Sequence, residues 1–366
     1  MAEVEGKTAT EVMKKSIEYV LNEGTKRKVY GGTIPKNIKD PKSPNDFDRE
    51  MIEADPGMTM VLTNPLARWT DYSNQWIGIT LREQEDHFQA YNPGHVIKYS
   101  KLYRRWLCKG FFNYTYGERF LTYPYNLKEK GKDKLLYDRR QFNQIEEVIR
   151  LLQEHPTTRK SCISTWYPRI DLGDPYCPCN AFMQIRIVND KLDWITVVRS
   201  LDVLRGYSEN IFMFTMWQEY IAKKLNVPLG KYTTVALNAH LYQDQIDAGY
   251  HKQKVPDCYD FYEVKPAFTE DFPSDKFKEI DDQLFNDKDV NLNLLPFSSF
   301  WRNWKLALIA DWFRLKNRVE DSEAIASLIN NEFKFSVIRR LYKKDKSVID
   351  LLQWDKQKKF LEELHG

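Results

Sequence analysis

The chain has 366 residues, of which 42% are hydrophobic and 29% are charged, and its formal net charge is +3 at pH 7. This composition is typical of a globular protein with a sizeable core, and the small net charge argues against an extended nucleic-acid or membrane surface. Because no apolar run approaches the roughly 20 residues of a membrane helix, no hydrophobic signal core is present and the cysteines form an odd, scattered set, we expect a reduced, cytoplasmic protein.

An amphipathic helix is predicted near the amino terminus, from Thr8 to Gly24. Thr8 and Glu11 have the spacing of a capping box, and Gly24 supplies a stop signal. The stretch from Pro35 to Pro56 is rich in proline, aspartate and lysine, a composition typical of an irregular loop.

The middle of the chain alternates between helical and β-rich patterns. Two β-rich runs flank Asn189 and Asp190, residue types that favour a tight turn, and therefore predict a hairpin. A later helical pattern is apolar on nearly every side, which indicates a helix central to the core. The expected elements, in chain order, are a helix over 141–155, a strand over 162–168, hairpin strands over 181–188 and 192–200, a helix over 210–225 and a strand over 232–242.

The pattern changes beyond about Tyr250. Proline-containing loops give way to lysine-rich helical segments over 322–344 and 347–366. We therefore expect a core domain over residues 1–250 and a helical C-terminal extension over 251–366 that packs partly on it.

Cys179 is the strongest candidate in the sequence for a chemically reactive residue. It follows a proline in the segment LGDPYCPCNAFMQIRIV, residues 172–188, at the start of an expected strand. It could fill the core, bind a metal together with Cys177, or act as a nucleophile. Structural zinc needs four ligands, usually in two close pairs, and no second close-spaced pair accompanies Cys177 and Cys179. A buried structural cysteine and a nucleophile remain the alternatives.

Side chains suited to phosphate binding occur on two separate segments. Arg159 and Lys160 precede one expected strand, and Arg199 and Ser200 end another. A phosphate dianion favours several charged donors, and arginine offers a forked pair of N–H groups. Taken alone, each segment is more typical of a solvated surface.

Three segments in this region resemble a known family. HPTTRKS, PCNAFMQIRIVNDKLDWITVVRSLDVLRGYSENI and NAHLYQDQ are similar, in order and spacing, to the core motifs of thymidylate synthase and the related pyrimidine nucleotide hydroxymethylases. The resemblance extends from about Tyr116 to Gln245. It implies an α+β fold, in which a large mixed β-sheet packs against helices and the far face of the sheet forms a homodimer contact.

The resemblance also implies a reaction that needs no metal. Cys179 would add as a thiolate to C6 of a pyrimidine nucleotide, so that C5 attacks a one-carbon unit from 5,10-methylene-tetrahydrofolate. Asn210 would read the uracil edge, because its amide can donate to O4 and accept from N3–H. The remaining implied roles are phosphate binding by Arg199, Ser200 and Lys28, phosphate binding across the dimer interface by Arg159 and Lys160, sugar binding by His240 and Tyr242, folate binding by Asp202 and Gly206, proton shuttling by Tyr116, and ordering of active-site water by Glu83.

Several positions depart from the thymidylate synthase pattern. Asn180 stands where histidine usually follows the nucleophile, Val198 stands in place of a glutamine, and Arg205 and Glu209 occupy usually apolar positions of the folate pocket. Polar surroundings would admit water to the methylene intermediate and give a hydroxymethyl product. The departures favour a phage-type deoxyuridylate (dUMP) 5-hydroxymethylase. The alternatives are a divergent thymidylate synthase, a dCMP or CMP hydroxymethylase, and a non-catalytic nucleotide-binding relative; no membrane or nucleic-acid partner is expected.

Overall fold

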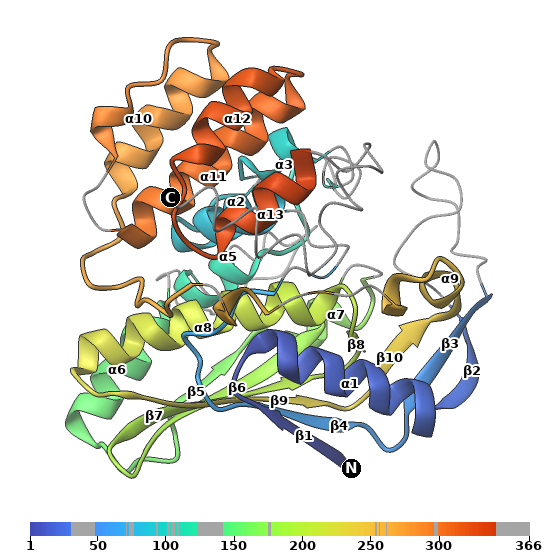
Figure 1. Cartoon of the computed structure of the whole chain (residues 1–366). Coiled ribbons are helices and arrows are strands. Elements are labelled where there is room, and N and C mark those ends of the chain that lie inside the picture. Colours follow the sequence, from blue (N-terminus) through green and yellow to red (C-terminus); the bar gives the residue numbers. More distant parts are fainter. Residues whose placement is uncertain are drawn as a thin grey trace, which may run out of the picture.

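The computed structural model describes residues 1–30, 48–70, 72, 77–92, 94–100, 103, 107, 110–122, 142–174, 177–252, 255, 257–260, 262–295 and 299–341. Its helices lie on one side of a curved layer of strands (Figure 1). Helices α1 (Ala9–Glu23), α6 (Gln144–Glu154) and α8 (Gly206–Leu225) are next to the strands, and a group of mainly C-terminal helices lies beyond them. The predicted α+β class, with a large mixed sheet packed against helices, is confirmed.

The strands form two sheets that meet near the centre of the molecule. The larger has the order β1-β4-β9-β7-β6-β5, in which β1–β4 and β7–β9 are parallel pairs and the other pairs are antiparallel. The smaller has the order β2-β3-β10-β8. The bounds are β1 Ala2–Gly6, β2 Thr25–Tyr30, β3 Asp48–Ala54, β4 Met58–Leu62, β5 Cys162–Ser164, β6 Asn180–Val188, β7 Lys191–Val198, β8 Leu201–Asp202, β9 Leu229–Ala236 and β10 Ala239–Tyr242.

The chain passes directly from the larger to the smaller sheet twice, from β7 to β8 and from β9 to β10. Strands β8 and β10 then pair in parallel, with Asp202 opposite His240. Residues that follow β7 and β9 in the sequence are therefore gathered at the junction of the two sheets.

Local signals account for the elements that the sequence predicts well. The hydroxyl of Thr8 accepts a hydrogen bond from the Glu11 N–H at 3.2 Å and so caps α1, whereas the Glu11 carboxylate bonds to the Lys7 N–H rather than completing the capping box. At the predicted hairpin, Asn189 and Asp190 have φ values of 49° and 61°. These left-handed conformations match the twist of a two-residue turn, and the hairpin of β6 and β7 is confirmed.

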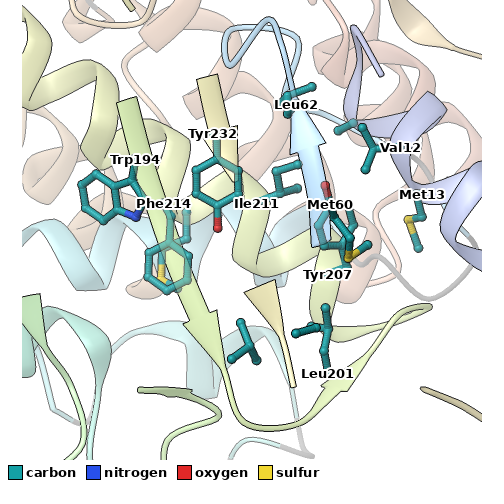
Figure 2. Packing of buried hydrophobic residues seen from close by; sticks show 14 of the residues in the cluster. Val12, Met13, Met60, Leu62, Trp194, Leu201, Tyr207, Ile211, Phe214 and Tyr232 are labelled. Atoms are coloured by element: carbon teal, nitrogen blue, oxygen red, sulfur yellow. The ribbon is translucent and has the colours of Figure 1, made fainter. Parts of the chain in front are cut away.

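The first hydrophobic core lies between the larger sheet and the helices α1 and α8 (Figure 2). Trp194 of β7 and Phe214 of α8 stack with ring centroids 6.2 Å apart, and Tyr232 of β9 lies beside them. All three side chains are fully buried. Burial of each such side chain contributes about 2–3 kcal/mol, so this core fixes α8 across the strands that carry the site.

A second core joins helices from distant parts of the sequence. It packs α2 (Ile77–Phe88) and α3 (Val96–Tyr99) against α10 (Ser274–Phe285), α11 (Ser299–Leu315), α12 (Val319–Ser327) and α13 (Phe333–Leu341). The C-terminal helices thus cover α2, and the division of the chain at about residue 250 stays a prediction. The remaining elements are α5 (Tyr116–Leu121), α7 (Pro168–Asp171), α9 (Gln243–Asp247) and short 3-10 turns at Tyr250–Lys252, Cys258–Asp260 and Leu292–Leu294.

The predicted loop over 35–56 is wrong from Asp48 to Ala54, which form β3. This strand lies between β2 and β10, and Ile52 and Ala54 are buried there. Pairing on both edges outweighs the polar composition of the stretch. Residues 31–47 lie outside the described part of the chain.

Four other predicted boundaries are corrected. The strand over 162–168 is regular only over β5, and the strand over 232–242 is split between β9 and β10 in different sheets. The central helix begins at Gly206 instead of residue 210. The helix over 322–344 is divided into α12 and α13, and 347–366 lie outside the described residues. No described helix combines the length and the apolar character needed to cross a membrane.

Candidate active site at the junction of the two sheets

The hairpin of β6 and β7 brings the predicted nucleophile and a predicted phosphate ligand together. Cys179 directly precedes β6, and Arg199 directly follows β7. The Arg199 N–H donates to the Cys179 carbonyl at 2.9 Å, and Nη2 lies 3.8 Å from the Cys179 sulfur. The same Nη2 lies 3.1 Å from the sulfur of Cys177. The two thiols therefore share one guanidinium.

Arg199 is held by the loop that carries the thiols. Its Nε donates to the Pro178 carbonyl at 2.9 Å and its Nη2 to the Cys177 carbonyl at 3.1 Å. The guanidinium carbon lies 5.6 Å from the centre of the Trp166 ring. These contacts use Nε and Nη2 of the guanidinium, so its Nη1 remains available to bind an anion.

Burial raises the pKa of the Cys179 thiol above its ordinary value. The charge of Arg199 opposes this shift, whereas Cys177 and Asp202 add to it. The net direction is upward, so Arg199 does not by itself make the thiol ionised at neutral pH. A nucleophile in this environment must lose its proton as it attacks.

Tyr116, Asn180 and Asn210 form a hydrogen-bonded group beside Cys179. The Asn180 backbone N–H and side-chain Nδ2 donate to the Tyr116 hydroxyl at 3.2 and 2.7 Å, and Nδ2 also donates to Asn210 Oδ1 at 3.2 Å. Burial raises the pKa of Tyr116, and Cys179 is the second cause. The group therefore connects α5, β6 and α8 next to the sulfur. The sequence marked Asn180 only as a departure from a pattern.

The predicted Glu83 lies on α2, beside Tyr103 and His87. The Tyr103 hydroxyl donates to Glu83 Oε2 at 2.6 Å, and His87 Nε2 lies 3.8 Å from Oε1. Burial raises the pKa of Glu83 to about 7; the Tyr103 hydrogen bond opposes this shift and the charge of Asp86 adds to it. The His87 ring meets the Tyr116 ring edge to face, with centroids 6.1 Å apart. Glu83 is thereby connected to the group beside Cys179.

A second carboxyl group faces this region from α8. Burial raises the pKa of Glu209 to about 8, and the nearby charge of Glu83 is the next cause. Arg205 opposes the shift. His87 and Tyr103 were not predicted as neighbours of Glu83. For His87 a signal was present, because residues four positions apart, such as Glu83 and His87, lie on the same face of a helix.

Asp202 and His240 lie side by side in the smaller sheet. Asp202 Oδ1 accepts from the N–H groups of Leu204 and Arg205 at 3.0 and 3.1 Å, and Oδ2 accepts from Gln245 Nε2 at 2.6 Å. His240 is 3% exposed, and its Nε2 has no hydrogen-bond partner among the described residues. The carboxylate is thus firmly oriented, and the imidazole retains a polar atom for a ligand.

Tyr242 completes this side of the junction. The guanidinium of Arg49 lies 3.5 Å from the centre of its ring and also contacts Asp244 at 2.7 Å. Burial raises the pKa of Tyr242, Arg49 opposes the shift, and the charges of Asp202 and Cys179 add to it. Tyr242 therefore faces the same site. Arg49 belongs to β3, which the sequence mistook for a loop.

Other predicted ligands are placed differently. Arg159 and Lys160 are exposed before β5, and the Arg159 carbonyl accepts from Gln184 at 3.1 Å. Gln184 is five positions along β6 from Cys179, about 16 Å at the rise of a strand. One chain alone does not bring these cations to the thiol.

The last three predicted residues lie on either side of the junction. Lys28, an implied phosphate ligand, is exposed on β2, opposite Glu50 of β3. Ser200 follows Arg199 directly, and Gly206 is the first residue of α8. Among the described residues, no group of three or more His, Cys, Asp or Glu side chains could hold a metal ion.

Similarity to known proteins covers this region. The sequence model of the family described as "Thymidylate synthase" matches residues 64–277. A "Putative thymidylate synthase" of Methanocaldococcus jannaschii is 33% identical over 155 residues, which are 41% of this chain and 64% of that protein. The "Thymidylate synthase" of Buchnera aphidicola is 28% identical over 142 residues, 38% of this chain and 48% of that protein. The match thus spans less than two thirds of either relative.

The fold is similar to that of the thermostable thymidylate synthase A from Bacillus subtilis. The TM-score is 0.50 at 17% sequence identity, and the likeness covers 69% of this chain and 85% of the other. At this level of identity the likeness concerns the fold.

Proposed function

Since the chain belongs to the thymidylate synthase family, we propose that it transfers a one-carbon unit to C5 of a pyrimidine nucleotide through a bond between Cys179 and C6. The observation that carries the proposal is the joint placement of Cys179, Arg199 and Asn210 at the sheet junction. A sulfur nucleophile, a cation for phosphate and an amide for the base edge are the groups that such a reaction requires.

The addition step assigns a role to each of these groups. The sulfur of Cys179 forms a bond to C6, the thiol proton passes to a water molecule, and the electron pair of the C5–C6 double bond moves toward C5 and O4. Arg199 binds the phosphate through Nη1 of its guanidinium. Tyr116, which already accepts two hydrogen bonds from Asn180, keeps its own hydroxyl proton available for the reacting ring. Orientation by these contacts supplies much of the rate advantage.

Methylene-tetrahydrofolate is the proposed one-carbon donor and would supply carbon at the oxidation level of formaldehyde. Asp202 and Gly206 would hold its ring. Asp202 is oriented by three hydrogen bonds, and the neighbouring Arg205 has a buried Nε without a hydrogen-bond partner among the described residues. A buried guanidinium nitrogen in this state fits a ligand with polar ring atoms.

The finer proposal is that dUMP is converted to 5-hydroxymethyl-dUMP, the reaction of a phage-type hydroxymethylase. Glu83 and Glu209 place two carboxyl groups near the reacting region. Before the last step, the one-carbon unit would bond to C5, C5 would lose its proton, and the bonds from that carbon to the two folate nitrogens would break, so that tetrahydrofolate leaves with both nitrogens protonated. In the final step a water oxygen bonds to the exocyclic methylene carbon, one water proton passes to the Glu83 carboxylate, the C5–C6 double bond re-forms, and Cys179 leaves C6 as a thiolate. The polar groups of Arg205 and Glu209 favour the entry of this water over its exclusion.

Product analysis tests the proposal. With dUMP and 5,10-methylene-tetrahydrofolate, mass spectrometry should detect 5-hydroxymethyl-dUMP and tetrahydrofolate. Thymidylate with dihydrofolate would contradict the hydroxymethyl product and indicate a divergent thymidylate synthase. A product formed from dCMP alone would indicate a cytidylate hydroxymethylase. Nucleotide binding without release of tritium from C5 of labelled dUMP would indicate a non-catalytic relative.

Turnover should rise with pH through about 7, because the proposed base is the ionised form of Glu83 and burial raises its pKa to that value. Below this pH the rate should fall by about tenfold per unit. Glu83→Gln should abolish this rise of turnover with pH, the acidic limb of the pH profile, and lower the maximal rate by about 10²- to 10⁴-fold. Turnover is measured at saturating dUMP from about pH 5.5 to about pH 8.5, a range that lies on both sides of the pKa of Glu83.

Glu209→Gln is the matched control for this profile. It changes the neighbouring carboxyl group, whose pKa is raised to about 8, and should retain the limb near pH 7 whatever its effect on the maximal rate. Loss of the limb in Glu209→Gln and its retention in Glu83→Gln would contradict the assignment of the base.

We also propose that the site is completed by a second copy of the chain, which would supply Arg159 and Lys160. The face of the larger sheet opposite α1, α6 and α8 carries no helix of the described residues (Figure 1). Phe182 of β6 is 41% exposed. A sheet face with such side chains is suited to burial against a copy of itself.

A further inference from the structure

We propose that Asn180 is a positioning residue that fixes the side-chain amide of Asn210 and thereby sets the choice of pyrimidine base. The inference rests on the proposed function and deepens it, because it concerns substrate selection in the same site. It assigns a role to a residue that does not itself need to touch the nucleotide.

Both amide protons of Asn180 are committed. One is donated to the Tyr116 hydroxyl at 2.7 Å and the other to Asn210 Oδ1 at 3.2 Å. The Asn180 backbone also donates to Tyr116 and accepts from the Thr165 hydroxyl. The side chain is 0% exposed, and its Oδ1 has no hydrogen-bond partner among the described residues. Asn180 is therefore anchored by its strand and by Tyr116, and its second amide proton is directed at Asn210.

This anchor distinguishes the two orientations of the Asn210 amide. In the observed one, Oδ1 of Asn210 accepts the proton of Asn180 Nδ2. If the amide turned over, its NH₂ group would face the NH₂ group of Asn180, and two donors would meet without an acceptor. Because the Asn180 side chain is fully buried, its donor would then lack both an acceptor and water, and such a mismatch is costly. Asn180 thus holds Asn210 in one orientation before any ligand binds.

The orientation matters because uracil and cytosine present opposite patterns. Uracil offers an acceptor at O4 next to a donor at N3–H, whereas cytosine offers a donor at N4 next to an acceptor at N3. An asparagine amide can match either edge, but only with its oxygen and nitrogen exchanged. A fixed Asn210 can therefore discriminate between the two bases, and a free one would adapt to both.

The test compares Asn180→Asp and Asn180→Leu with the unmodified protein. The aspartate side chain has the same shape and replaces the donor with an acceptor, so the Asn210 amide should turn over. The leucine side chain is of similar shape, forms no hydrogen bond and suits a buried position. Tritium release from C5 of labelled dUMP and dCMP gives kcat/KM for each substrate. The dUMP:dCMP ratio should fall by about tenfold or more in Asn180→Asp and by a smaller factor in Asn180→Leu.

Asn303→Asp is the matched control. Asn303 is also a buried asparagine, and its Nδ2 donates to Asn330 Oδ1 at 2.6 Å in the helical region. This variant alters a similar amide pair that shares no residue with the proposed site, and it should leave the substrate ratio unchanged. A general loss of packing would lower both rates together without changing their ratio.

The possible outcomes separate the two proposals. Absence of tritium release by the unmodified protein from either nucleotide would overturn the proposed function and this inference with it. A selective unmodified protein, with an unchanged ratio in the folded Asn180 variants, would overturn the inference alone. Circular dichroism checks folding, and if Asn180→Asp does not fold, the ratio measured for Asn180→Leu decides.

Discussion

Cys179→Ser is expected to lower turnover by about 10⁴-fold or more, the scale of loss when a covalent nucleophile is removed. A serine hydroxyl is far less acidic than a thiol, and among the described residues the side chain that contacts the Cys179 sulfur is a guanidinium, which cannot act as a base to activate it. The affinity for dUMP should change by only a few-fold, about the effect of losing one weak contact, because Arg199 and Asn210 remain. Steady-state turnover, tritium release from C5 and calorimetric binding of dUMP measure these effects.

Cys177→Ser is the matched control, because the two thiols lie two residues apart and both contact Nη2 of Arg199. It should retain turnover within about tenfold, since the altered group only helps to hold the guanidinium. The opposite result, with activity lost in Cys177→Ser and kept in Cys179→Ser, would make Cys177 the nucleophile. A matching loss in both variants would indicate that the thiols act through Arg199 and not by bonding to the base.

Elements governed by local interactions were predictable from the sequence. The hairpin depends on Asn189 and Asp190, and α1 depends on its cap Thr8 and its apolar stripe; both sets of residues are adjacent in the chain. In contrast, β3 exists because of its partners β2 and β10, and β10 is contributed by residues nearly 200 positions away. Composition within the strand does not contain that information.

The candidate site likewise combines contacts that follow from local sequence with contacts that depend on tertiary structure. Cys179 and Arg199 are brought together by the hairpin, so their proximity follows from a local turn. His87 and Arg49 approach the site from elements whose tertiary placement the sequence did not indicate. Asn180 was visible as a departure, but its hydrogen bonds to Tyr116 and Asn210 depend on three elements meeting in space.

The helix that carries Glu83 is anchored by a buried network of charges. Lys305 Nζ of α11 lies 2.7 Å from Asp281 Oδ1 of α10 and 3.0 Å from Glu85 Oε1 of α2. Arg82 Nη1 contacts Asp281 Oδ2 at 2.5 Å. All four side chains are at most 2% exposed. Arg82 Nη2 also lies 2.9 Å from Glu85 Oε1 and 3.3 Å from Asp86 Oδ1. Two cations are therefore shared by three buried carboxyl groups across three helices, in a region where water cannot solvate them.

Lys305→Met should lower the free energy of unfolding by about 3–5 kcal/mol, because it leaves the carboxylates of Glu85 and Asp281 with Arg82 as their remaining partner in this network. This loss is a large fraction of the roughly 5–15 kcal/mol of a typical domain. Urea unfolding followed by circular dichroism measures it. Lys278→Met is the matched control: Lys278 is exposed and lies 4.0 Å from Asp275, so its removal should cost less than about 1 kcal/mol.

The pH profile of turnover in folded Lys305→Met shows whether the charge network positions Glu83 or only stabilises the fold. Glu83 lies between Arg82 and Glu85 on α2, so loosening of these anchors should displace its carboxyl group from Tyr103. Losing that hydrogen bond should raise the pKa of Glu83, because the Tyr103 bond lowers it at present. The limb of the pH profile should therefore move to higher pH in Lys305→Met. An unmoved limb, together with equal stability losses in Lys305→Met and Lys278→Met, would show that the network does not position Glu83.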